Sequence, residues 1–500
     1  MTVKVLLWAD AGLTEFIISK YLNEKLEADI YAIYDVNHHL KQSFTSQKIV
    51  NFKKCWFYWD NYYKILEPAD LDYLSNFESK YNIDLWQLAY SERIFYKFNP
   101  FHQFTKNEIL SILSIDCKFF EKILDDIKPD FLIIKAPDML RHELLWKLCN
   151  SKGIKILTSY TGRIGNRTII SQNFDSFDSK FIFNSDKLSS VSFIELQNYL
   201  QKFNKTKQMK KSRSGGVGFS FTQKIKIFFD WMTKTLDEEY KKTYDHYGIT
   251  IFTVLKTSLK NEFNRWYRNK ILSNLSQTQI PDEQFIYFPL QVEPERNVSF
   301  GAPYFSNQFE VISHLAKSLP VNYKLYVKEH FSMKLRSWRS IEFYKKILNL
   351  PNVRLIHPDV SQNELLSKCS LVCAITGSTG FEASVYGKPS LVFANVSYSE
   401  LSCVFKIYDL DNIPNLIQHA LQFKVNPIEI KQYIEFIIQN SIEFDAVSFH
   451  EKIMTEFHRG PIFDDKIDME KLLKFLNDNQ ESLEILSQAY ADKILELYKN

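Results

Sequence analysis

Residues 371–400, LVCAITGSTGFEASVYGKPSLVFANVSYSE, decide the predicted fold. Two short apolar runs, 371–375 and 390–394, have the length and the Gly and Pro boundaries of strands that are covered on both faces of a parallel sheet. Between them the sequence predicts a glycine-bracketed turn, a short helix over 381–386 and a stop at Gly387-Lys388-Pro389. This strand–turn–helix–strand unit is the basis of an α/β domain.

The turn after the first of these strands is a candidate binding site. Backbone N–H groups and two hydroxyls at the start of a helix form a site for an anion, and phosphate is the commonest biological anion. We expect Glu382, one turn into the helix, to hold either a ribose or the turn itself, with simple packing as the alternative. The predicted phosphate-binding residues are Thr376, Gly377, Ser378, Thr379 and Gly380.

Composition limits the classes of protein to which the chain can belong. Its 500 residues exceed one core, and 45% hydrophobic with 24% charged residues is typical of a soluble globular protein. A net charge of +3 gives no indication of a nucleic-acid partner. The six cysteines are scattered, as expected for thiols in a reducing cytoplasm. The N-terminal apolar run is too short for a signal peptide, and no uncharged apolar run is long enough to span a membrane.

Strands and helices alternate in two parts of the chain. This pattern predicts two doubly wound, Rossmann-type domains that face a cleft. We expect an N-terminal acceptor domain over 1–185 and a donor domain over 281–425. A helical, basic linker or insertion over 186–280 joins them, and C-terminal helices over 426–500 pack back on the body. The aromatic-rich segment 50–100 gives no clear order of elements.

The insertion contains two segments, one basic and one aromatic, and each has a membrane contact as its alternative interpretation. Residues 202–213, from Lys202 to Arg213, hold six basic residues and no acid. We expect a solvated linker there, with a peripheral contact to anionic lipid as the alternative. Residues 222–272 are helical and rich in Phe, Trp and Lys. We expect them to pack on the first domain, the alternative being that they lie on a membrane.

Polar residues follow three predicted strands of the second domain. They are the turn 376–380, the segment 291–296, and the run Lys328-Glu329-His330. The carboxyl ends of parallel strands meet at one edge of a sheet, so these groups converge. Together they supply what a phosphate-bearing donor needs. The alternatives are that Glu293 and Glu295 are solvated acids, that His330 supports its neighbours, and that the hydroxyls only cap the helix.

Two parts of the chain resemble the bacterial capsule polysaccharide biosynthesis family, whose members are GT-B glycosyltransferases related to the Kdo transferases of capsule assembly. The resemblance covers roughly 105–175 and 285–395 and is most specific in TGSTGFEASVYGKP and in KEH; the insertion has no counterpart that we can name. It implies sugar transfer from a nucleotide-activated donor. Related transferases have a His-Pro pair where this chain has His330 and Phe331, and a catalytic carboxylate where it has Glu293 and Glu295.

The sequence therefore predicts a glycosyltransferase of surface-glycan or capsule synthesis. The donor is a CMP-, UDP- or GDP-linked sugar, and kinship to Kdo transferases favours a CMP-linked acidic sugar. We expect its phosphate to lie on Ser378 and Thr379, with Lys328 and His330 neutralising charge. We expect the glycan or lipid-linked acceptor to lie near the first domain, where the candidate residues are Asp10, Asp138, Arg163 and Arg167.

Two mechanisms stay open at this point. If the enzyme inverts, a first-domain carboxylate, Asp10, is the general base; if it retains, Glu295 or Glu293 is the nucleophile. No paired carboxylates follow a donor-domain strand, so we expect no obligatory metal. We expect a cytoplasmic protein, with the inner face of the cytoplasmic membrane as its peripheral site. The rival functions are a nucleotide-sugar 2-epimerase of the same fold and a non-catalytic scaffold.

Overall fold

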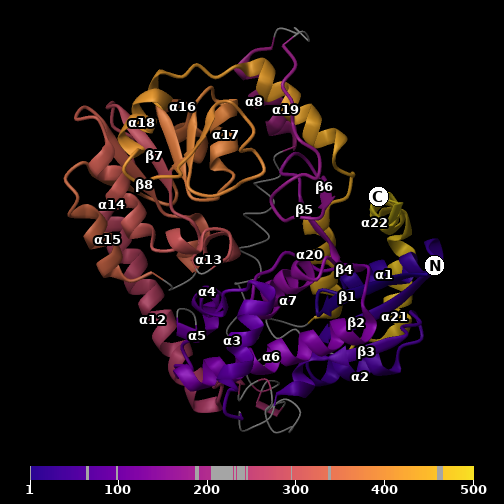
Figure 1. Cartoon of the computed structure of the whole chain (residues 1–500). Coiled ribbons are helices and arrows are strands. Elements are labelled where there is room, and N and C mark those ends of the chain that lie inside the picture. The colour runs from indigo at the N-terminus through magenta and orange to yellow at the C-terminus, as the bar shows by residue number, and fades with distance from the viewer. Residues whose placement is uncertain are drawn as a thin grey trace.

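The computed structural model describes residues 2–62, 67–96, 99–185, 191–203, 229, 232–233, 243, 246–293, 295–335, 339–458 and 466–499. Two sheets, each covered by helices, form the body (Figure 1). Most of the basic segment 202–213 and much of 222–250 lie outside the described residues. Within the described residues, no helix combines the length and the apolarity that crossing a membrane requires.

The first sheet has the strand order β3-β2-β1-β4-β5-β6, with β6 antiparallel to β5 and all other neighbours parallel. This is the classical Rossmann order. The strands are β1 (Val3–Asp10), β2 (Ala28–Asp35), β3 (Lys54–Phe57), β4 (Phe131–Ile133), β5 (Lys155–Thr161) and β6 (Thr168–Ser171). Its helices are α1 (Thr14–Lys25), α2 (His38–Ser46), η1 (Tyr58–Asn61), α3 (Leu71–Tyr81), α4 (Leu85–Ser91), α5 (Arg93–Tyr96), α6 (Lys106–Ile127) and α7 (Leu140–Ser151).

The second sheet repeats this order as β12-β11-β10-β7-β8-β9, with every pair parallel. Its strands are β7 (Phe285–Pro289), β8 (Lys324–Lys328), β9 (Val353–Ile356), β10 (Leu371–Ala374), β11 (Ser390–Val392) and β12 (Val404–Lys406). Its helices are α13 (Arg296–Ser299), η2 (Pro303–Phe305), α14 (Gln308–Ser318), η3 (Phe331–Leu335), α15 (Ile341–Leu348), α16 (Gln362–Lys368), α17 (Thr379–Val385) and α18 (Ile413–Gln422). The predicted GT-B-like fold of two doubly wound domains is confirmed.

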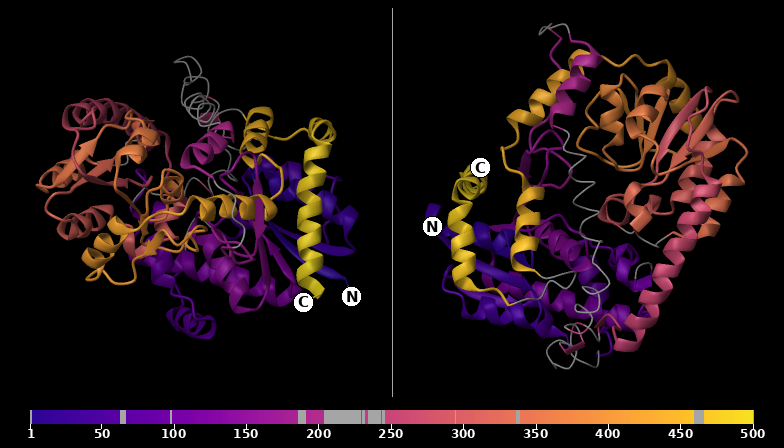
Figure 2. Two further views of the ribbon diagram at one scale, coloured as in Figure 1. Left: turned by 90° about the horizontal axis from the view of Figure 1, so that it is seen from above. Right: turned by 180° about the vertical axis from the view of Figure 1, so that it is seen from behind.

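The remaining helices connect or cover these sheets. They are α8 (Phe193–Phe203), α12 (Ile251–Leu275), α19 (Pro427–Gln439), α20 (Ala446–Phe457), α21 (Met469–Asp478) and α22 (Gln480–Lys499). Alternate β1 residues face opposite sides of the sheet, with Leu7 on one side and Trp8 on the other. On the side of Leu7, the tail helices supply Ile453, Leu486 and Ile494 to the core. The tail therefore crosses back and completes the first domain, as Figure 2 shows beside the N-terminus.

Helix α12 runs from the first domain to the second along one side of the molecule (Figures 1 and 2). Just before it, Gly248 lies against His102 of the first domain, and near its end Leu272 is buried in the second core. Between these ends Phe252, Leu259 and Phe263 are exposed. The expectation that this segment packs on the first domain is wrong for α12, because amphipathicity alone does not identify what lies against the apolar face.

Candidate functional site

Each sheet has a switch point at which the chain reverses its direction of strand addition, between β1 and β4 and between β7 and β10. Ligands of doubly wound sheets bind beyond the carboxyl ends of the strands at such points. The second switch point brings Gln291, after β7, against Gly377, after β10. The candidate phosphate turn is therefore at the place in the second domain where a ligand is expected.

The two positions Gly377 and Gly380 require glycine because neighbouring side chains lie too close for a Cβ atom. A Cβ atom on Gly377 would lie 2.7 Å from Gln291 Nε2, and one on Gly380 would lie 2.6 Å from Tyr398 Oη. The Tyr398 hydroxyl donates a hydrogen bond to Gly377 O and accepts one from the Gly380 N–H. Because Tyr398 is buried, it fixes the shape of the turn from beneath.

Alanine at these two glycines is expected to have different effects. Gly380→Ala drives a Cβ into the buried ring of Tyr398 and should lower the free energy of unfolding by about 1–3 kcal/mol. Gly377→Ala meets only the end of the Gln291 side chain, which can move, so its loss should stay below about 1 kcal/mol. Denaturant unfolding of both variants measures the difference. Equal losses would mean that Tyr398 does not hold the turn.

Hydrogen bonds within the turn explain Glu382. Its two carboxylate oxygens accept from Ser378 Oγ at 3.0 Å and from Gln362 Nε2 at 2.6 Å. Burial raises the pKa of Glu382, and these bonds together with Arg163 oppose the shift. On the other side of the turn, Thr376 Oγ1 donates to Asn297 O at 3.1 Å. Glu382 is thus bonded to the turn through Ser378, and its binding of a ribose stays a prediction.

The strand end at Lys328-Glu329-His330 is built around a buried carboxylate. Glu329 is fully buried and accepts hydrogen bonds from Arg339 Nη1 at 2.5 Å, Tyr344 Oη at 2.6 Å and the His330 N–H at 2.7 Å. Lys328 is buried beside it, whereas His330 is exposed. His330 Nδ1 accepts from the Ser332 N–H at 3.2 Å, so a neutral imidazole carries its proton on Nε2. The imidazole is thereby oriented as a donor.

The two candidate nucleophiles have different surroundings. Glu293 Oε2 lies 3.6 Å from Arg339 Nε, and Arg339 also donates to Gln291 O. Glu295 precedes α13, where its carbonyl accepts the N–H groups of Val298 and Ser299. Arg339 therefore ties the ends of β7 and β8 together and holds Glu293 by its charge. Nothing in the sequence around Arg339 indicates this position, since it follows the strand ends by a long loop.

The carboxyl edge of the first sheet carries paired charges. Asp10 Oδ2 lies 2.7 Å from Lys135 Nζ, and Asp138 lies 3.7 Å from the same nitrogen and 2.8 Å from His142 Nδ1. Burial alone would raise the pKa of Asp10 and of Asp138. The charge of Lys135 outweighs burial at Asp10, and Lys135 together with His142 outweighs it at Asp138, so both pKa values are lowered. Asp10 and Asp138 are thus brought together, in their ionised forms.

Glu15 shows the opposite electrostatic behaviour. Burial, and then the charge of Asp10, raise its pKa from about 4.5 to about 8. Because the folded pKa lies above the unfolded one, the folded state takes up a proton, and stability should fall as the pH rises from about 4.5 to about 8. Glu15→Gln should remove this fall, which is on the order of 3 kcal/mol. Unfolding of the parent and the variant at pH 5 and pH 8 tests it; equal slopes would contradict it.

The two arginines of the predicted acceptor set lie apart. Arg163, in the turn between β5 and β6 with φ 57°, lowers by its charge the pKa of Glu382 and of Tyr398, which burial raises. Arg167 instead donates to Ser441 Oγ at 2.8 Å and to Ile438 O at 3.1 Å, at the end of α19. Of these two arginines, Arg163 is the one whose charge acts on Glu382 and Tyr398 at the turn of the second domain.

Contacts between the domains arise from loops at the carboxyl ends of both sheets. Arg296, after β7, has its Nη1 atom 3.2 Å from Asp175 Oδ2, and its guanidinium lies 3.4 Å from the centre of the Phe174 ring. The charge of Arg296 also lowers the pKa of Glu143, which burial raises. The two carboxyl edges thus face each other. The sequence did not indicate Asp175 or Glu143, because neither directly follows a predicted strand.

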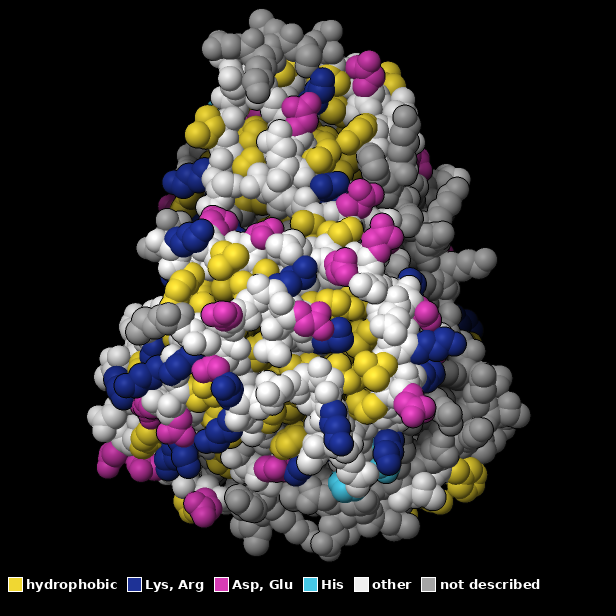
Figure 3. All heavy atoms as spheres, turned by 90° about the vertical axis from the view of Figure 1, so that its right-hand side faces the viewer, with side chains coloured by type: hydrophobic (Ala, Val, Ile, Leu, Met, Phe, Trp, Pro, Cys, Tyr) yellow, Lys and Arg dark blue, Asp and Glu magenta, His cyan; other side chains and the backbone are white. Residues whose placement is uncertain are grey.

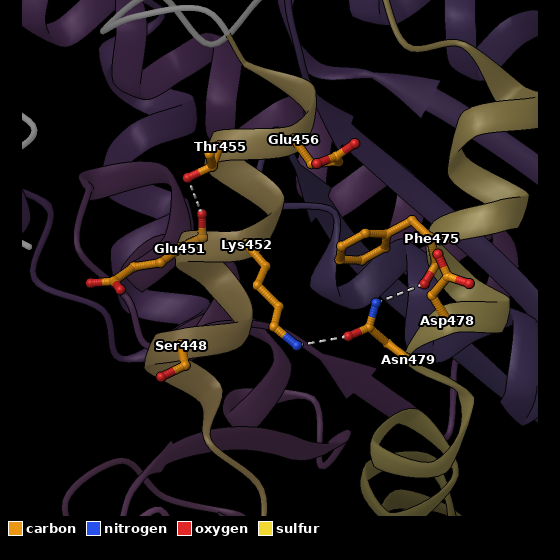
Figure 4. A pocket seen from close by; sticks show the side chains of 8 residues that line it. All are labelled: Ser448, Glu451, Lys452, Thr455, Glu456, Phe475, Asp478 and Asn479. Atoms are coloured by element: carbon orange, nitrogen blue, oxygen red, sulfur yellow. Dashed lines mark hydrogen bonds between the residues drawn. The ribbon is translucent and has the colours of Figure 1, made fainter.

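A hollow of about 610 Å³ lies elsewhere, between α20 and α21 (Figure 4). Its polar side chains are tied to each other, since Lys452 Nζ donates to Asn479 Oδ1 at 3.0 Å and Asn479 Nδ2 donates to Phe475 O at 2.8 Å. It is formed by residues of the tail alone. Among the described residues, no group of three His, Cys, Asp or Glu side chains is arranged to hold a metal ion.

Comparison with a family model identifies part of the chain. The model described as capsule polysaccharide biosynthesis protein matches residues 192–401. This segment is similar to the capsule polysaccharide biosynthesis family. The match contains both strands of the second switch point, the candidate phosphate turn 376–380 and α12. It confirms the resemblance over 285–395, extends it into the insertion, and does not include 105–175. No curated protein matches the chain.

Solved structures give distant likenesses. The beta Kdo 2,7 transferase KpsC of Thermosulfurimonas dismutans is 14% identical, with 70% of this chain and 87% of that chain covered and a TM-score of 0.31. The UDP-GlcNAc 2-epimerase of Methanocaldococcus jannaschii is 13% identical, with 88% and 99% covered and a TM-score of 0.24. The S. aureus MnaA-UDP co-structure is 13% identical, with 92% and 100% covered and a TM-score of 0.26. Scores of this size carry no argument about activity.

Proposed function

We propose that the protein is a glycosyltransferase that moves a sugar from a nucleotide-activated donor to a capsule or surface-glycan precursor. The observation that carries this proposal is the position of the turn 376–380 at the second switch point, where Gln291 after β7 meets Gly377 after β10. A phosphate-binding turn and an acceptor domain on two sides of one cleft are what a transfer between two substrates needs. The match of the segment 192–401 to the model of the capsule polysaccharide biosynthesis family supports the same proposal.

On the donor side, we assign the nucleotide phosphate to the hydroxyls of Ser378 and Thr379 and the neighbouring amides. Lys328 and the guanidinium of Arg163 supply positive charge from other directions, and the Nε2–H of His330 supplies a hydrogen-bond donor. Fixed charges of this kind stabilise a leaving phosphate without reorganisation during the reaction. Because side chains supply the charge, the proposed reaction needs no obligatory metal, and EDTA should leave turnover unchanged. Abolition by EDTA with rescue by Mg²⁺ would contradict this part.

On the acceptor side, the reaction needs a carboxylate near the sugar. For inversion, a first-domain carboxylate takes the proton of the acceptor hydroxyl. Asp10 must then break its pair with Lys135, whereas Asp175 and Glu143 already face the second domain through Arg296. Burial raises the pKa of both Asp175 and Glu143, which favours proton uptake. For retention, Glu295 or Glu293 attacks the anomeric carbon and forms a glycosyl-enzyme bond as the nucleotide leaves.

Incubation with CMP-, UDP- and GDP-sugars, with and without a capsule-glycan acceptor preparation, tests the proposal. A transferase releases nucleotide at least about tenfold faster when acceptor is present, and the sugar appears in the acceptor. A 2-epimerase instead converts the donor in the absence of acceptor. The Ser378→Ala, Thr379→Ala double variant should lose transfer. Full activity in that variant, or donor conversion without acceptor, would overturn the assignment.

A further inference from the structure

An apolar stripe runs along the outer face of α12. Phe252 is 84% exposed, Leu259 75% and Phe263 63%, and Leu255, Trp266 and Tyr267 extend the same face. Their spacing of three and four residues places them on one side of the helix. Large apolar side chains gathered in this way mark an interaction surface rather than scattered exposure. The 25-residue helix is about 37 Å long, so the stripe is an extended surface.

The charges of α12 select the kind of partner. The helix carries five basic residues and a single acid, Glu262, which pairs with Arg265. Lys256 and Lys260 are exposed on the flank of the stripe, and Lys270 Nζ lies 5.4 Å from the centre of the Trp266 ring. Arg268 is turned inward and donates to Met333 O. An apolar face with Trp and Phe and basic flanks is the pattern of helices that lie in an anionic membrane interface.

A second copy of this chain fits the surface less well. Symmetric pairing of two α12 helices would bring the basic flanks of both copies together, and like charges at close range oppose it. An anionic bilayer complements the same flanks. Elsewhere the surface differs: on the face that carries the tail helices, acidic and basic side chains are interspersed (Figure 3).

We propose that α12 docks this protein flat on a membrane surface of anionic phospholipid, with Phe252, Leu259, Phe263 and Trp266 inserted among the lipids. The helix joins the two domains and is fixed at both ends, by Gly248 against His102 and by Leu272 in the second core. Docking therefore holds both domains at a fixed orientation to the lipid. This proposal does not depend on the reaction, and it extends to lipid-linked acceptors only if the proposed function holds.

Vesicle flotation tests the docking. The full-length protein should float with vesicles of phosphatidylglycerol and phosphatidylcholine and bind pure phosphatidylcholine vesicles more weakly. Leu259→Glu with Phe263→Glu should reduce binding at least about tenfold. The matched control, Val321→Glu with Tyr408→Glu, changes two exposed apolar residues of the second domain and should bind like the parent. Binding of the α12 variant equal to that of the control would overturn the proposal.

Two further measurements distinguish membrane insertion from misfolding of the variant and from dimer formation. Brominated phosphatidylglycerol should quench the fluorescence of Trp266, measured as the difference in quenching between the parent and the Trp266→Phe variant. This measurement does not depend on whether the double variant folds. No quenching of Trp266 would overturn insertion. Sedimentation velocity without lipid tests whether a second copy of the chain covers the stripe. If the parent does not float with vesicles but forms a dimer, and the Leu259→Glu, Phe263→Glu variant is a monomer, the stripe is a dimer interface and the proposal is overturned.

Discussion

Replacing Arg339 by methionine is expected to lower the free energy of unfolding by about 3–5 kcal/mol. The side chains of Arg339 and Glu329 are 3% and 0% exposed, and their atoms are 2.5 Å apart. Methionine leaves the Glu329 charge buried, and the partners that remain for it among the described residues are the Tyr344 hydroxyl and the His330 backbone amide. The strand ends that carry Gln291 and His330 should loosen at the same time. Denaturant unfolding followed by circular dichroism measures the loss.

Two companion variants make this prediction specific. Lys368→Met removes an exposed i, i+4 pair with Glu364 and should change stability by less than about 0.5 kcal/mol. Adding Glu329→Gln to Arg339→Met removes the buried charge itself and should restore part of the loss. If Arg339→Met lost no more than Lys368→Met, the buried pair would not be what holds the strand ends.

Arg163→Ala is expected to reduce the rate constant of sugar transfer by about 10²–10³. Arg163 is the first-domain cation whose charge reaches Glu382 and Tyr398 at the donor turn. A charge that stabilises the leaving phosphate acts most strongly in the transition state, so kcat should fall more than donor affinity. Steady-state kinetics with the preferred donor separate the two quantities.

Arg167→Ala provides the matched control four residues along the chain. Its guanidinium binds the end of α19 through Ile438 and Ser441, so its loss should cost about 1–3 kcal/mol of stability with kcat preserved below the melting transition. Arg163→Ala should therefore lower kcat, whereas Arg167→Ala should lower stability. A fall in kcat for Arg167→Ala as large as that for Arg163→Ala would return both residues to the acceptor site.

Local patterns predicted most of the fold. The buried strands β10 and β11 are short apolar runs bounded by Gly or Pro, and they lie within the predicted ranges 371–375 and 390–394. The strands that were missed are short or irregular: β12 has three residues, and β3 lies in the aromatic segment KCWF without alternation. No prediction covers β6, because its antiparallel pairing with β5 leaves no parallel-strand pattern in the sequence.

The sequence predicts the position of the turn in the candidate site but not that of the charged residues around it. The turn 376–380 follows its strand directly, so the geometry of a parallel sheet was enough to place it. Arg163 and Arg167 look alike in TGRIGNR, and only the β5–β6 hairpin directs one to the donor turn and the other to α19. Arg339 meets Gln291 and Asp175 meets Arg296, and both contacts join parts of the chain that are far apart in sequence, which no local pattern contains.

Nucleotide binding at the turn 376–380 tests the central claim most directly. Thermal unfolding of the parent is followed with CMP, UDP and GDP, and with Gly377→Val, whose side chain would occupy the space of the Gln291 amide. One nucleotide should raise the melting temperature of the parent, by the equivalent of about 2.7 kcal/mol at a hundredfold excess over Kd, and should leave Gly377→Val unchanged. No shift with any nucleotide, or an equal shift in both proteins, would contradict a donor site at this turn.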